Sequence, residues 1–230
     1  MIFSPPNFGV QLKAKLAMAK IAATISAKST ERSIVVEAKK ILASLGLTHT
    51  WYYNCPVFVL LGSRSCISQS GRDYVPAEEP VGVENLVTID LSPCEGTLWG
   101  DFARSLCVES GHVVEKPLSP AFSEGIAVEH QLHRLMAEFV TPETSFHQLC
   151  EFANDAIATA GYENLDFMGN VGHSIEISRN NRRYIEIGNH QPLGAVTCFT
   201  FEPHIRRKGE RWGFKHEDIY FFDACRCHAL

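Results

Sequence analysis

The stretch Val87–Ser105, VTIDLSPCEGTLWGDFARS, carries two aspartates in strand-like surroundings. Asp90 ends a very apolar run, and Asp101 follows eleven residues later, after a turn that contains Pro93 and Gly96. Two strands joined by such a turn can place both carboxylates side by side. Adjacent carboxylates are unfavourable unless they are protonated or bind a metal, and a buried aspartate needs a partner. The pair predicts a metal site, although either aspartate alone would more often be structural.

Three further donor residues follow in the second half of the chain, namely His173, Glu202 and Glu217. The two glutamates lie in the strand-like runs FTFEP and KHEDIYFF. The five residues are spread over more than half the sequence, so only a folded sheet can bring them together. Four carboxylates and one imidazole suit one or two divalent ions such as Mn, Fe, Co or Zn. Two metals that share carboxylates can hold and activate a water molecule. If the five residues converge, we expect a metal-dependent hydrolase.

Apolar spacing predicts helices and strands in two similar halves. The predicted helices cover residues 8–29, 34–45, 124–139 and 141–160, the last of them starting at Thr141 and Pro142. The predicted strands cover residues 51–61, 81–91, 97–108, 173–178, 184–187, 196–202 and 217–222. This order indicates an α+β domain with a mixed or antiparallel sheet backed by helices. No low-complexity linker divides the chain, so we expect a single domain over residues 1–230.

Composition excludes several function classes. The chain has 230 residues, 45% of them hydrophobic and 20% charged, and a net charge of −5 without a long basic stripe, so we expect no nucleic-acid partner. No apolar run reaches the roughly 18 residues of a membrane span, and the N-terminus lacks the layout of a signal peptide. We therefore expect a cytoplasmic protein with no membrane partner. The 8 cysteines are scattered and are expected to be reduced thiols; the segment 225–228 (CRCH) has the wrong spacing for a standard zinc site.

The five donor residues and their local sequences resemble the creatinase, methionine aminopeptidase and proline aminopeptidase superfamily, the pita-bread metallopeptidases of the M24 type. In that family the second aspartate follows the first by eleven residues and precedes a Thr-Arg or Ser-Arg element; here Asp101 precedes Phe-Ala-Arg-Ser. The family histidine lies in Gly-His-Gly, and here the segment 172–174 reads Gly-His-Ser. The first glutamate lies in Thr-x-Glu-Pro, as in 200–203, and the last precedes aspartate, as in 217–218. The resemblance covers roughly residues 10–222.

The resemblance implies a pita-bread fold, in which two pseudo-related αβ halves share a curved, mostly antiparallel sheet. It also implies roles for the five residues. Asp90 would chelate one metal, Asp101 and Glu217 would bridge two metals, and His173 and Glu202 would complete the second site. A bridging hydroxide would attack an amide carbonyl, in an Xaa-Pro peptide or another small peptide-like or modified amino-acid substrate. Glu202 would accept the proton, and His173 is the other catalytic candidate.

The sequence departs from the family in the histidines outside the metal shell. One family histidine lies about seventeen residues before the first aspartate, where this chain reads Ser-Gly-Arg-Asp at 70–73. The other lies seven residues after the metal histidine, where this chain has Asn180. Arg72, Asn180 and His204 are the candidates to contact substrate in their place, against the alternative that Arg72 and Asn180 are solvated loop residues. His130 and His133 are expected to face solvent.

Three functions stay open at this stage. The first is a dinuclear metallohydrolase that cleaves an amide. The second is a pita-bread binding protein that has lost turnover, and the third is a changed enzyme with one metal that acts on a small metabolite. The family's proline-directed members carry an additional N-terminal domain, and we expect this chain to be the catalytic domain alone. Neither the metal, the substrate nor a homodimer is decided by the sequence.

Overall fold

A large antiparallel sheet forms the centre of the computed structural model, which describes residues 4–224 and 226–230. Its strands are β2 (Val57–Leu61), β3 (Asn85–Leu91), β6 (Phe102–Glu109), β7 (His112–Val114), β8 (Tyr162–Asn164), β9 (Phe199–Phe201), β10 (His204–Arg207), β11 (Gly213–Asp223) and β12 (Arg226–Ala229). The main path runs β2-β3-β6-β11-β10-β8, with β7 paired to β6 and with β9 and β12 paired to β11. A smaller sheet has the order β1-β4-β5, formed by β1 (His49–Thr50), β4 (Pro93–Glu95) and β5 (Leu98–Trp99).

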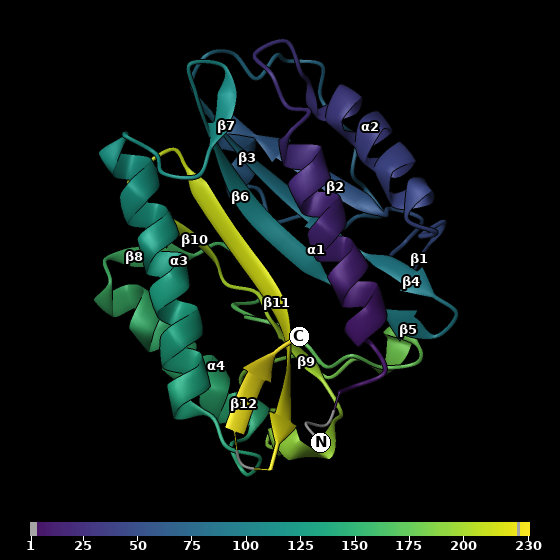
Figure 1. Ribbon diagram of the computed structural model, residues 1–230. Coiled ribbons are helices and arrows are strands. Elements are labelled where there is room, and N and C mark those ends of the chain that lie inside the picture. The colour runs from purple at the N-terminus through teal and green to yellow at the C-terminus, as the bar shows by residue number, and fades with distance from the viewer. Residues whose placement is uncertain (1–3, 225) are drawn as a thin grey trace.

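Two pairs of helices cover one side of the large sheet (Figure 1). They are α1 (Phe8–Ala22), α2 (Glu31–Ser44), α3 (Pro120–Phe139) and α4 (Phe146–Thr159). One hydrophobic cluster joins α1 and α2 to β2, β3 and β6, and a second joins α3 and α4 to β8, β9, β10 and β11. The curved sheet with one helix pair on each half confirms the predicted pita-bread fold.

Four of the predicted helix bounds are wrong. The second helix begins at Glu31 instead of residue 34, and the third begins at Pro120 instead of residue 124. The first helix ends at Ala22 because the following residues turn back, where Ser26 forms an isolated bridge with His112. The fourth begins at Phe146 instead of Thr141. Ser145 and Gln148 form a reciprocal capping box there, which satisfies two free N–H groups of the first turn.

The burial of α3 also differs from the prediction. His133 is buried, because α3 lies across polar residues of β11: its Nδ1 is 2.7 Å from the Tyr220 hydroxyl, and its Nε2 is 3.0 Å from the carbonyl oxygen of His216. His130 is exposed, as predicted. Gly125 allows this close packing, since a Cβ atom there would lie 2.2 Å from the ring of Phe214.

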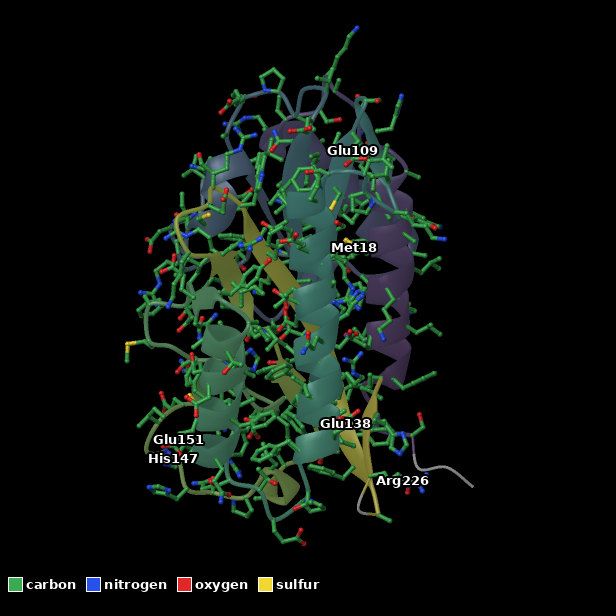
Figure 2. The ribbon with its side chains drawn as sticks, turned by 90° about the vertical axis from the view of Figure 1, so that its left-hand side faces the viewer. Met18, Glu109, Glu138, His147, Glu151 and Arg226 are labelled. Carbon is green, nitrogen blue, oxygen red and sulfur yellow. The ribbon has the colours of Figure 1, made fainter. Side chains whose placement is uncertain are left out.

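Figure 2 shows α3 running along the molecule from near Glu109 towards Glu138. The carboxylate of Glu109 accepts hydrogen bonds from the backbone N–H groups of Leu118 and Ser119, just before the helix begins. A negative charge at this end is favourable because it faces the positive end of the helix dipole. Among the helices that the structure describes, none has the length and apolar content needed to cross a membrane.

Candidate metal centre

Three neighbouring strands, β3, β6 and β11, position Asp90, Asp101 and Glu217. Asp90 on β3 is paired with Ala103 on β6, and Ala103 is paired in turn with Glu217 on β11. Side chains directly opposite one another point to the same face of a sheet, and Asp101 lies two residues before Ala103, so its side chain shares that face. The small side chain of Ala103 leaves space between the flanking carboxylates. The pairing register of these strands, more than proximity in the sequence, therefore brings the carboxylates together.

The other two donors come from the second half of the molecule. His173 forms an isolated bridge with Tyr184, and the next residue, Ser174, forms one with Phe199. Glu202 directly follows β9, whose Phe201 is paired with Asp218 on β11. The regular strands predicted at 173–178 and 184–187 are wrong, since only isolated bridges occur there.

Asp101, His173 and Glu217 form a close group of donors. One ligand atom from each lies within 4.8 Å of the other two. Asp101 Oδ2 and Glu202 Oε1 lie 3.5 Å and 3.7 Å from His173 Nε2. Asp101 Oδ2 and Glu217 Oε2 are buried and accept no hydrogen bond from any residue that the structure describes. Such oxygens are unfavourable without a partner, and a divalent cation would supply one.

The imidazole of His173 has the tautomer and the charge state that a metal ligand needs. Its Nδ1 lies 2.9 Å from the backbone carbonyl oxygen of Ser174, so Nδ1 carries the hydrogen and Nε2 keeps its lone pair. Burial lowers the pKa of His173 to about 4, although Glu202 opposes this shift. The ring is therefore neutral near pH 7, which is the form that binds metals.

Burial and mutual repulsion raise the pKa values of two carboxylates in the cluster. Burial, followed by the charge of Asp90, raises the pKa of Asp101 well above its usual range. Burial, followed by the charge of Asp101, does the same to the pKa of Glu217. A cation placed between these carboxylates would lower both pKa values. The donor set of two carboxylates and one imidazole, with Glu202 beside it, fits a divalent transition metal.

Sequence reasoning missed Lys215, whose ammonium lies inside the carboxylate cluster. Lys215 Nζ is 2.7 Å from Asp90 Oδ2, 3.0 Å from Glu202 Oε2 and 3.9 Å from Glu217 Oε2. Burial opposes its charge, but these carboxylates outweigh burial and raise the pKa of Lys215 well above its usual value. Burial would likewise raise the pKa of Glu202, but Lys215, through its charge and its hydrogen bond, together with His173 and Arg182 outweighs burial and holds that pKa below its usual value. Burial raises the pKa of Asp90 despite the ion pair. Lys215 lies two residues before Glu217 on one strand and shares its face, but this spacing brings it to the other carboxylates only through the pairing of β11 with β6.

Gln11 is a second residue that sequence reasoning missed. Its fully buried side chain accepts a hydrogen bond from the backbone N–H of Asp101 and donates one to the Asp101 carbonyl, both at 2.8 Å. This pair of bonds attaches Asp101 to α1. The polar residue interrupts the apolar side of a predicted helix, which is the signal that could have revealed it.

A cavity of about 630 Å³ opens above the donor cluster. Asp90, Asp101, His173, Glu202 and Glu217 all lie among its lining residues. Aromatic residues form much of the remaining wall, namely Trp51, Tyr52, Tyr53, Phe58, Phe167 and Tyr184. The segment that holds the first three of these was predicted to be strand, but β2 starts only at Val57, and Tyr53 and Asn54 turn with positive φ.

The three predicted substrate contacts lie in different places. Arg72 and His204 line the cavity, whereas Asn180 is exposed and lies outside the cavity wall. Arg72 donates to the Tyr53 hydroxyl at 3.1 Å. His204 donates from Nε2 to the Ser65 carbonyl at 2.6 Å, and burial lowers its pKa to about 4. Arg182, which was not predicted, lines the cavity beside His173, and its guanidinium lies over the rings of Trp51 and Tyr184 at 5.1 Å and 5.2 Å.

The family model of metallopeptidase family M24 matches residues 10–224. The chain therefore belongs to this family of metal-dependent peptidases. No curated protein matches the sequence.

Solved structures of related fold include peptidases of more than one specificity. The structure is similar to X-Pro aminopeptidase from Thermotoga maritima MSB8, with a TM-score of 0.80 at 17% identity over 100% of this chain. It is similar to dipeptidase PepE from Mycobacterium ulcerans, with a TM-score of 0.78 at 21% identity over 97% of this chain. Methionine aminopeptidase from Rickettsia prowazekii gives 0.72 at 15% identity over 100% of this chain. The chain spans 62% and 55% of the first two proteins and 98% of the third.

Proposed function

We propose that this protein is a metal-dependent hydrolase that cleaves an amide bond in a short peptide or a modified amino acid. The observation that carries the proposal is the group formed by Asp101, His173 and Glu217, with two buried carboxylate oxygens lacking a donor, at the base of a cavity. When bound there, a divalent metal would lower the pKa of a water ligand and polarise a carbonyl. Mn, Fe, Co and Zn all suit these donors.

Glu202 has the position and charge of a general base. Burial would raise its pKa, but Lys215 and the neighbouring His173 and Arg182 together hold it below the usual value, so its carboxylate is ionised at neutral pH, and Oε1 faces His173 at 3.7 Å. An ionised carboxylate beside the site can take a proton from the attacking water and pass it to the leaving amine. Lys215 orients the other oxygen, Oε2, at 3.0 Å, which keeps Glu202 from rotating away.

The cavity wall supports a substrate that is small, partly apolar and anionic. Aromatic rings face the cavity, and the guanidinium groups of Arg72 and Arg182 line it. Aromatic surfaces suit an apolar ring such as proline, and guanidinium groups suit a carboxylate. An Xaa-Pro dipeptide combines these features, as does an N-acylated amino acid.

Turnover on a defined panel tests the proposal. The metal-free protein would be reconstituted separately with Mn²⁺, Co²⁺, Fe²⁺ and Zn²⁺, and amine release would be measured from Xaa-Pro, Xaa-Gly and N-acetylated amino acids. We expect release that depends on metal and falls at least about 100-fold in Asp101→Asn and Glu202→Gln. Glu151→Gln, on the exposed side of α4, is the control and keeps full turnover. Folded protein that releases no amine with any metal would contradict the proposal.

A binding protein without turnover is the second candidate. It is supported by Asn180, which stands where the family has a histidine and lies outside the cavity wall. Calorimetry with the same panel separates the two candidates. Saturable binding without amine release would favour the binding protein.

A further inference from the structure

The carboxylates of the cluster fall into two groups with different partners. Asp101 Oδ2 and Glu217 Oε2 accept no hydrogen bond from any described residue and lie near the free Nε2 of His173. Asp90 Oδ2 and Glu202 Oε2 instead contact the Lys215 ammonium at 2.7 Å and 3.0 Å. Lys215 Nζ also lies 3.9 Å from Glu217 Oε2, which is beyond hydrogen-bond distance, so the ammonium is held closely by Asp90 and Glu202 and only loosely by Glu217.

The ammonium would compete with a second metal for the carboxylate of Asp90. A divalent metal binds carboxylate oxygens at roughly 2.0–2.2 Å, and an ion on Asp90 Oδ2 would have to compete with Lys215 Nζ, which already contacts that oxygen at 2.7 Å. Both positive charges would also be brought within a few ångströms of each other in a buried site, where charges are poorly screened. Asp90 can therefore bind the ammonium or a metal, but not both.

The lysine is held at both its backbone and its ammonium. Its backbone N–H donates to Ser105 Oγ at 2.8 Å, and its Cα is paired with that of His204 in the register between β10 and β11. Its side chain is only 20% exposed, and its ammonium contacts carboxylates from β3, from β11 and from the residue after β9. Moving it away would leave Asp90 without a cation, which is costly for a buried carboxylate.

We propose that Lys215 replaces the second metal, so that this protein binds a single divalent ion through Asp101, His173 and Glu217, with Glu202 beside it. The inference rests on the proposed metal-dependent function and specifies the composition of that site. Asp90 then acts as the partner of Lys215 and is not a ligand of the bound ion.

Metal stoichiometry tests the inference without reference to turnover. Metal-free protein would be titrated by calorimetry with Mn²⁺, Co²⁺ and Zn²⁺ separately, and metal per chain would be measured by elemental analysis after gel filtration. We expect one ion per chain in the wild type and two in Lys215→Met, which shortens the unbranched side chain by one atom and removes its charge. Lys15→Met is the matched control: Lys15 pairs with Asp218 at 3.1 Å on the other face of β11, and its removal leaves one ion.

A second pair of variants keeps the test decisive if Lys215→Met does not fold. We expect Asp90→Asn to keep one ion with a Kd within about threefold of wild type, and Asp101→Asn to lose it. Two ions in the wild type would overturn the inference and leave the proposed function intact. One ion in folded Lys215→Met would also overturn it, because the lysine would then not be what excludes the second metal. No ion in any form would remove the proposed function as well.

Discussion

At the scale of single residues, the environment of His133 makes stability depend on pH. Its Nε2 donates to the His216 carbonyl and its Nδ1 accepts from Tyr220, so the folded protein holds a neutral ring. Burial, followed by the nearby His216, lowers its pKa well below the usual value, and Arg104 acts in the same direction while Asp218 opposes it. The unfolded chain binds a proton near pH 6.5 and the folded chain does not, so stability is lost as pH falls below that value.

Replacement of His133 by Gln should therefore flatten the dependence of stability on pH. Between pH 6.5 and 5, one such histidine contributes a loss of up to about 2 kcal/mol, at 1.36 kcal/mol for each pH unit. Urea unfolding at steps of half a pH unit, in the presence of a chelator, would measure this loss of stability. The exposed His112 on β7, replaced by Gln, is the control. An unchanged slope in His133→Gln would contradict this account.

A second prediction at the scale of single residues concerns Arg182, whose charge should govern the binding of anionic substrates. It lies over Trp51 and Tyr184, whose rings contact that of His173 at 5.5 Å and 6.1 Å. A guanidinium–carboxylate contact contributes about 1.5–3 kcal/mol, so we expect Arg182→Gln to raise KM at least tenfold for peptides with a free carboxylate. Amidated peptides should show little change.

Arg183→Gln provides the matched control. Arg183 lies next in sequence but pairs with Glu176 at 3.5 Å, and it is not among the residues that line the cavity. Its KM should stay near that of the wild type. Equal effects of the two substitutions would show that Arg182 acts through general charge and not through contact with the substrate.

At the scale of elements, the short segment around Gly172 should control the position of the metal histidine. Gly172 has φ +148°, and a Cβ atom there would lie 2.2 Å from the carbonyl oxygen of Thr200. The same Thr200 bonds to the backbone of His173 at 2.7 Å and, through its Oγ1, at 3.0 Å. Gly172→Ala must separate these segments and move the imidazole.

We expect Gly172→Ala to lower the free energy of unfolding by about 2–3 kcal/mol and to weaken Mn²⁺ binding about 10- to 100-fold, as loss of ligand orientation does. Denaturant unfolding and calorimetry would measure both. Gly169→Ala is the control, because its φ is also positive but no atom lies within 4 Å of the added Cβ. Gly169→Ala should lower the free energy of unfolding by about 1 kcal/mol without a change in metal affinity.

Elements differ in how far sequence could predict them. Helices were recognised because each carries several turns of apolar spacing, but their ends depend on caps such as Ser145 and on tertiary packing. The aromatic run at 51–56 has high strand propensity and nevertheless forms the cavity wall. Aromatic residues stabilise a buried wall as well as a strand, so propensity could not distinguish the two.

The residues of the site also differ in how far the sequence could predict them. Aspartates and glutamates in apolar runs stand out by type, and the structure brings all five predicted residues to one cavity. Lys215 could not be selected by type, because a charged lysine is not a metal ligand. Its place depends on the register between β6 and β11, where Glu217 is opposite Ala103. Register across strands from distant parts of the chain is not encoded in local pattern.

At the scale of the whole molecule, the donor cluster joins two halves that have separate hydrophobic clusters. Asp101 comes from the first half, and His173 and Glu217 come from the second. A ligand that binds only the folded protein stabilises it by about 2.7 kcal/mol at 100 times its Kd. For a chain of this size, 1 kcal/mol shifts Tm by about 2–4 °C.

Saturating Mn²⁺ should therefore raise Tm by about 5–10 °C, and chelator should reverse the change. Because the bound ion needs donors from both halves, neither half can keep it after separating, and the rise should appear as one shifted transition. Scanning calorimetry would measure it. Asp101→Asn should show no rise, whereas Glu151→Gln should show the full rise. A metal-induced shift of equal size in Asp101→Asn would place the stabilising ion elsewhere in the molecule, since this substitution removes the oxygen charge that faces His173 at 3.5 Å.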